Sequence, residues 1–292
     1  MKIFILIFWA FTVSYGHAQA RIERQRIEDK SVIYDRQAEE RFAFQVKTID
    51  EFMERFNDSE STLLRKYLDV SRPGVIKSDR IRMLKALFEK KSFVKDSLKT
   101  AFAASVCDSL NPQFLNFFQK NWYAQAQCLF QDGARNKYIT LVLKVLRTAN
   151  GGSKWVIAGA SEYGIAKQNK STVRMTGGDT RKGLNPYSHV MDFTELEDAL
   201  EDKINIESYL DEGFLTLKNQ PIIEAILSGK IRFNYVQEIT YHFLQIEGWI
   251  FSVQNFKRMT RQSGWLITQL QPADKEEKDF YKQAVLALKV TQ

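Results

Sequence analysis

Residues 138–160 read YITLVLKVLRTANGGSKWVIAGA and predict a β-hairpin. Apolar residues fill both arms. Between the arms stands Asn150-Gly151, the strongest short-range signal for a hairpin turn, because both residues tolerate a positive φ angle. We therefore expect two long antiparallel strands that are joined at this dipeptide.

A looser copy of this hairpin lies at residues 249–270, where WIFSVQNF is followed by WLIT. Trp155 and Trp265 each begin the last strand of a meander, and they stand 265 − 155 = 110 residues apart. One further strand precedes each hairpin, over residues 122–130 and 232–246, the first with a clear period of two. We interpret the chain as two related units; the alternative is chance similarity between two generic helix-then-hairpin arrangements.

Helical patterns precede both meanders. The tetrads Thr48-Ile-Asp-Glu51 and Asp192-Phe-Thr-Glu195 have the form of a capping box, in which an N-cap side chain and a glutamate bond each other's backbone amides. Apolar residues follow each cap at the same offsets of one, four and eight positions. Further helices are predicted over 61–68, 78–88, 111–118, 204–210, 217–227 and 274–290.

These patterns predict an α+β protein with two domains. We expect a signal peptide over 1–20, a charged leader over 21–41, a first α+β domain over 42–165, a polar, glycine-rich linker over 166–190, and a second α+β domain over 191–292 that ends in a helix.

Helices followed by a meander whose final strand begins with tryptophan resemble the cone-shaped, cystatin-like fold shared by nuclear transport factor 2 and ketosteroid isomerase. The residues that carry the resemblance are 48–56 with 138–160, and 192–200 with 249–270. The resemblance implies two cone-like units in tandem, each with helices packed on a curved antiparallel sheet that leaves a pocket at its open end. Similar tandem modules occur in bacterial conjugation and secretion assemblies. Such pockets serve enzymes, ligand binders and interaction modules alike, so the fold does not select the function.

Residues 1–20 have the pattern of a cleavable secretory signal, with Lys2, an apolar run over 3–13, and Ala18-Gln-Ala20 before Arg21. The run is shorter than the roughly 20 apolar residues that span a bilayer. We therefore expect a bacterial protein that is periplasmic or secreted after cleavage near Ala20. Export argues against cytosolic roles and against nucleic-acid partners.

Removal of the signal leaves 41 basic and 35 acidic residues, a net charge of 41 − 35 = +6. This modest excess is spread along the chain and is typical of a solvated surface. The alternative is that it favours anionic partners such as phospholipid headgroups or acidic polysaccharide. We expect any membrane contact to be peripheral at most.

Cys107 and Cys128 are the only cysteines. In an oxidising compartment, a disulfide between them would contribute about 3 kcal/mol in the chain-entropy model. The alternative is two buried free thiols, since spacing does not determine pairing. Two cysteines and three histidines are too few to indicate a structural zinc site, and we predict neither a metal nor a cofactor.

Enzymes of the family that the chain resembles place an aspartate or histidine and a tyrosine in the pocket. His242 is the candidate catalytic base, and Glu238 lies four residues before it on the same face of a strand, where it would orient the imidazole. The favoured alternative is that both belong to a solvent-facing polar set. His189, near Tyr187 in the linker, is interpreted as a surface residue rather than a ligand.

Nucleophile-elbow, P-loop, dinucleotide and metalloprotease motifs are absent from the sequence. Their absence favours a non-enzymatic binding or scaffold protein with an envelope protein as partner. That function predicts an exposed apolar or aromatic patch. The alternative is a binder of a small apolar ligand or an isomerase-type enzyme, which predicts a deep apolar cavity with a few polar groups.

Overall fold

The computed structural model describes residues 43–58, 76–148, 150–162, 182–214, 219–258 and 262–288. The signal peptide predicted over 1–20, the leader over 21–41, the helix over 61–68 and most of the linker lie outside these ranges.

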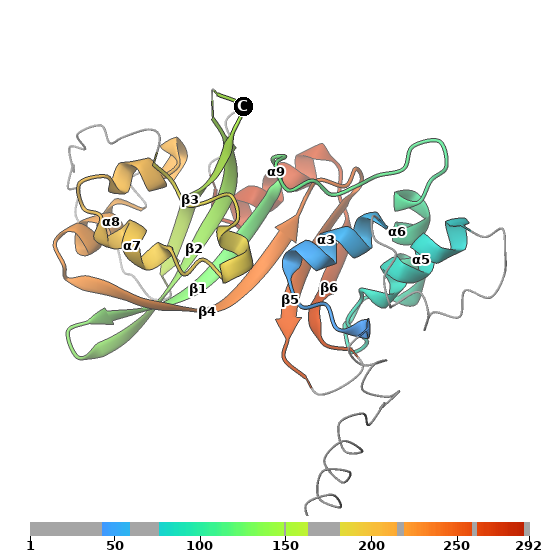
Figure 1. Ribbon diagram of the computed structural model, residues 1–292, viewed down its shortest axis with the longest axis horizontal. Coiled ribbons are helices and arrows are strands. Elements are labelled where there is room, and N and C mark those ends of the chain that lie inside the picture. Colours follow the sequence, from blue (N-terminus) through green and yellow to red (C-terminus); the bar gives the residue numbers. More distant parts are fainter. Residues whose placement is uncertain are drawn as a thin grey trace, which may run out of the picture. The chain divides into compact units, whose positions relative to one another are not determined.

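Six strands form one antiparallel sheet in the order β3-β2-β1-β4-β5-β6 (Figure 1). The first meander supplies β1 (Trp122–Asp132), β2 (Arg135–Arg147) and β3 (Ser153–Glu162), and the second supplies β4 (Ile231–Phe243), β5 (Trp249–Phe256) and β6 (Gly264–Pro272). Both predicted meanders are confirmed, as is the α+β class. The two meanders join through β1 and β4, which pair from Trp122 opposite Phe243 to Asp132 opposite Ile231.

Helices precede each meander, and one follows the second. They are α3 (Ile49–Asn57), α5 (Ile76–Ala86) and α6 (Asp96–Val106), then α7 (Leu196–Glu201) and α8 (Gln220–Leu227), then α9 (Lys275–Ala284). Short 3-10 helices add η1 (Ser188–Met191), η2 (Ile206–Tyr209) and η3 (Glu212–Phe214). Of these α-helices, only α6 was not predicted.

The two predicted capping boxes have different outcomes. The N-cap at Thr48 is confirmed, because its Oγ1 accepts a hydrogen bond from the backbone N–H of Glu51 at 3.1 Å. The second half of this capping box does not form as predicted, because the Glu51 carboxylate accepts from the N–H of Lys47. The prediction at Asp192 is wrong: this residue ends η1 with φ 50°, and α7 begins only at Leu196. Glu195, the expected partner, instead accepts hydrogen bonds from the backbone N–H of Asn185 and the hydroxyl of Ser188.

The helix predicted over 111–118 is also wrong, because this segment is an irregular loop. The side chain of Asn57 at the end of α3 bonds both backbone groups of Leu115, each at 2.8 Å. That pairing across 58 residues replaces the local bonds that a helix would make.

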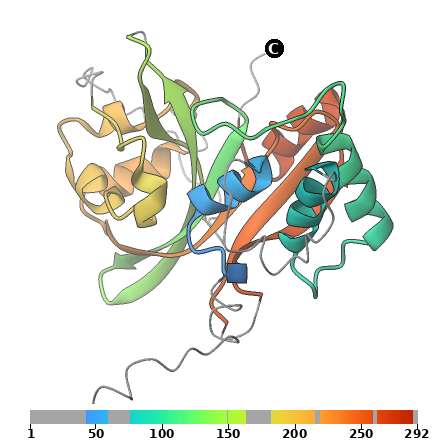
Figure 2. The ribbon, with the colours of Figure 1, turned by 45° about the vertical axis from the view of Figure 1, so that its right-hand side comes forward.

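The helices of the first half pack on strands of the second meander, whereas those of the second half contact strands of both meanders (Figures 1 and 2). Next to α3, Val46 forms a bridge with Gly264 at the start of β6, and Phe88, after α5, forms one with Ile267. In the reverse sense, Leu210, after η2, pairs with Ile157 of β3. From Ala43 onward the chain forms one compact unit.

Two cone-like units are therefore not confirmed, because the six strands form one sheet and the segments beside α3 and α5 pair with β6 of the other repeat. The domain boundary at 166–190 stays a prediction.

The two faces of the sheet carry separate cores. The larger core lies between the sheet and the helices α3, α5, α6, α7 and α8, and contains Phe52, Trp122 and Phe251. Side chains alternate along a strand, so Tyr123 points to the opposite face. There it packs in a smaller cluster with Tyr281 of α9.

Candidate functional site

His189 is a buried histidine in η1, beside the first turn of α3. After η1, Asp192 and Phe193 both have positive φ angles, of 50° and 56°, and they turn the chain back so that Phe193 N–H donates to the carbonyl of Ser188. The hydroxyl of Tyr241 donates to the His189 carbonyl at 3.2 Å. These bonds fix the backbone on which the imidazole is carried.

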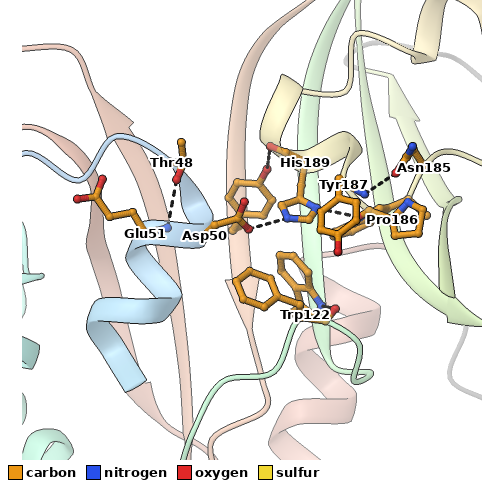
Figure 3. Close-up of polar contacts among 11 residues, drawn as sticks. Thr48, Asp50, Glu51, Trp122, Asn185, Pro186, Tyr187 and His189 are labelled. Carbon is orange, nitrogen blue, oxygen red and sulfur yellow. Dashed lines mark hydrogen bonds and ion pairs between the residues drawn. The ribbon is translucent and has the colours of Figure 1, made fainter. Parts of the chain in front are cut away.

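Both nitrogens of the His189 ring have partners (Figure 3). The indole N–H of Trp155 lies 3.2 Å from Nδ1, and it also donates to the carbonyl of Pro186 at 3.0 Å. Because an indole nitrogen only donates, Nδ1 is the acceptor and carries no proton. The proton is therefore on Nε2, which donates to the Asp50 carboxylate at 2.8 Å. The geometry specifies a neutral imidazole bonded to a half-exposed carboxylate.

Aromatic rings surround this imidazole. Phe117 stacks on it with 5.9 Å between centroids and 22° between planes, and Trp122 meets it edge-on at 5.5 Å. Trp155 and Tyr187 lie 5.8 Å and 6.4 Å away. The ring is thus held on several sides as well as through both nitrogens, so we expect little freedom of rotation.

Apolar side chains reach solvent around this buried group. Phe118 is in ring contact with Phe117, which itself stacks on His189. Tyr187 and Met191 are 61% and 64% exposed, and Phe118 and Val190 are also exposed. We call Phe118, Tyr187, Val190 and Met191 the Tyr187 patch. The Tyr187 patch is therefore an exposed aromatic surface supported by a rigid, hydrogen-bonded part of the protein.

The chemistry open to His189 is limited by its bonds. A general base needs a free nitrogen within reach of a substrate proton. Here one nitrogen faces an indole and the other a carboxylate inside the protein. The arrangement joins α3 to η1 and supports the Tyr187 patch, and we assign it no catalytic step.

His242 lies on the other face of the sheet, under α9. Its Nδ1 lies 2.8 Å from the hydroxyl of Tyr281, and its Nε2 lies 3.0 Å from Oε1 of Gln125. Burial lowers the pKa of His242 to about 4. The prediction that His242 faces solvent is wrong, because α9 covers it; Glu238, by contrast, is exposed. Both ring nitrogens bond to residues other than Glu238, so the structure does not form the proposed catalytic pair.

Cys107 and Cys128 are free thiols, so the alternative of a disulfide is not realised. Cys107 is the partly buried C-cap residue of α6, whereas Cys128 is buried in the middle of β1. Burial raises the pKa of the Cys128 thiol to about 12. Neither position is that of a reactive nucleophile.

Two of the pockets on the described part of the chain have volumes of about 500 and 540 Å³. Lysines line both pockets, with one acidic residue in the smaller pocket and three in the larger, and the smaller pocket also contains Phe44 and Phe88. Within the described ranges, no cluster of three or more His, Cys, Asp or Glu side chains is placed to hold a metal ion. Over the same ranges, every helix is too short or too polar to cross a membrane.

The burial of His189 had no local signal in the sequence. The nearest strong pattern, the cap at Thr48, marks the start of α3 but says nothing of Asp50 facing a residue 139 positions later. Comparisons with known protein families, with characterised proteins and with solved structures find no match for this chain.

Proposed function

We propose that the protein is an exported, non-enzymatic binding or scaffold protein, and that the Tyr187 patch contacts an envelope protein partner. The observation that carries the proposal is an exposed aromatic surface next to the buried His189, whose two ring nitrogens are both hydrogen-bonded. Exposed apolar side chains that lie together mark interaction sites.

The composition of the patch suits protein binding. Tyrosine and methionine are enriched at protein interfaces, where they offer large contact areas. Burying such a side chain stabilises a complex by about 1.5–3 kcal/mol. Because the Asp50–His189–Trp155 bonds hold the supporting turn before a partner arrives, little ordering entropy opposes binding.

The alternative, a small-molecule binder or isomerase-type enzyme, has less support. It requires an apolar cavity with a few convergent polar groups, whereas both pockets described above are rich in charged side chains. His242 and His189 both use their two ring nitrogens in bonds within the protein.

Site-specific photo-crosslinking tests the proposal. The full chain would be exported in the bacterium that encodes it, with a photoreactive amino acid at Met191 or, as the control, at Ile204, which is 84% exposed and outside the patch. We expect a discrete protein adduct from position 191 only, and its loss when Tyr187→Ser is added. Equal adducts from both positions, or none, would refute the assignment of the patch.

Native mass spectrometry of the same purified protein addresses the alternative. A small molecule that leaves on denaturation would favour the pocket function over the scaffold.

A further inference from the structure

The loop between α5 and α6 presents an isolated aromatic side chain to solvent. Residues 87–95 read LFEKKSFVK, and we call them the Phe93 loop. Phe93 is 104% exposed, the highest value among the large apolar residues in the described ranges. Phe88 at the start of the loop is buried, and Val94 packs against the core. The loop therefore has inward anchors and one outward apolar residue at its tip.

This loop is held in place rather than free. Ile267 of β6 donates its N–H to the Leu87 carbonyl at 2.8 Å and accepts from the N–H of Glu89 at 2.9 Å. The side chain of Gln262 accepts from the N–H of Lys90 at 2.9 Å and donates to the Phe88 carbonyl. Within the loop, the N–H of Ser92 donates to the Glu89 carbonyl at 3.1 Å. Exposure of Phe93 is thus built into a rigid scaffold.

Lysines are frequent in the sequence on both sides of Phe93. From position 85 to 99 the chain has five lysines and two acids, a net charge of 5 − 2 = +3. One of the acids, Glu89, is 3% exposed and bonds Arg258 through both oxygens, at 2.9 and 3.1 Å. That carboxylate is therefore neutralised inside the protein. The five lysines are Lys85, Lys90, Lys91, Lys95 and Lys99.

A pocket of about 500 Å³ opens beside the loop. Its lining includes Lys85, Lys90 and Lys99, with Asp96 as the one acid and Phe88 on its apolar side. The ammonium of Lys99 lies 3.1 Å from Asp96. With three cations against one anion, the pocket suits a phosphate group that carries an apolar portion.

We propose that the Phe93 loop docks the protein on the surface of an anionic phospholipid bilayer. Phe93 inserts at the interface, Lys91 and Lys95 contact lipid phosphates, and the adjacent pocket receives one headgroup. This surface is separate from the Tyr187 patch and does not rest on the proposed function. An acidic protein would need a fitted pocket for the projecting ring, whereas the apolar boundary of a bilayer accepts a single exposed phenylalanine without one.

Charge complementarity sets the expected size of the effect. Each lysine near an anionic leaflet strengthens binding about fivefold. Loss of three lysines should therefore weaken vesicle binding about 100-fold. Removal of the inserted ring should weaken it at least tenfold.

The test is co-sedimentation of the full chain, processed by export to a bacterial periplasm, with vesicles of phosphatidylcholine alone or mixed with phosphatidylglycerol. We expect binding to the mixed vesicles only, and a decrease as salt rises. Phe93→Ser and the triple variant Lys90→Gln, Lys91→Gln and Lys95→Gln should lose binding to the extents given above. Leu110→Ser is the matched control, because Leu110 is 94% exposed and lies outside residues 85–99.

Circular dichroism spectra should match the wild type for every variant compared. Tyr187→Ser should bind vesicles like the wild type, which separates this proposal from the proposed function. Three results would overturn it: no binding to mixed vesicles, equal binding to neutral ones, or a loss in Leu110→Ser as large as in Phe93→Ser. Binding to poly-glutamate as tight as to mixed vesicles, and unaffected by Phe93→Ser, would assign the loop to acidic polymers instead and would also overturn it.

Discussion

Gly264→Ala tests whether the segment before α3 lies against β6 of the other repeat. Gly264 has φ +87°, and a Cβ added there would stand 1.8 Å from the carbonyl oxygen of Val46. Val46 holds this position by donating its N–H to Ser263 at 3.1 Å and accepting from Trp265 at 2.9 Å. An alanine at position 264 therefore forces the two backbones apart.

The expected loss of stability follows from these contacts. An L residue at this φ costs about 1–2 kcal/mol. Breaking the two hydrogen bonds adds about 1 kcal/mol each. Gly264→Ala should thus lower the free energy of unfolding by about 3–4 kcal/mol, measured by urea denaturation. Gly248→Ala is the matched control, because Gly248 has φ +75° and nothing within 4 Å of an added Cβ.

The free energy of unfolding of the control variant should fall only by the cost of an L residue at a positive φ, about 1–2 kcal/mol. If both variants lose the same free energy, Val46 does not lie against β6, and the packing of the segment before α3 on the second meander is refuted.

Three further predictions concern His242, the bond between Asp50 and His189, and the two cysteines. Burial lowers the pKa of His242 from 6.5 to about 4, so in that window the unfolded chain binds a proton that the folded protein does not. The free energy of unfolding should fall by on the order of 3 kcal/mol as pH is lowered through the window. Urea denaturation at a series of pH values measures this fall, and His242→Gln should largely remove it. A double-mutant cycle of Asp50→Ala and His189→Phe should give a coupling energy of about 1 kcal/mol; a value near zero would show that the 2.8 Å bond does not join α3 to η1. Alkylation in urea without reductant should add two groups, at Cys107 and Cys128, whereas a disulfide would leave both unmodified.

Local signals predicted much of the secondary structure. Asn150-Gly151 marks the hairpin between β2 and β3, where Gly151 has φ +85°. The cap at Thr48 works because Glu51 is three residues away and belongs to the same turn. Such features depend on a few neighbouring residues, so the sequence alone suffices to predict them.

Long-range contacts decide the remaining features. Glu195 fits a capping box by spacing, but it bonds to Asn185 and Ser188 instead. His189 follows a polar, glycine-rich segment, yet Asp50 and Trp155 bury it from two distant parts of the chain. Helical periodicity marks where a helix forms, but it does not show on which strands of the sheet that helix packs.

Amide hydrogen exchange over β1 and β4 tests most directly that the two repeats form a single sheet. In the structure these strands pair with each other at the centre. Residues 122–132 of β1, and residues 240–243 of β4, have a strand on both sides and should therefore be as protected as β2. Two separate units would instead leave both strands at free edges. Fast exchange in both strands, with protection kept in β2 and β5, would contradict the continuous sheet.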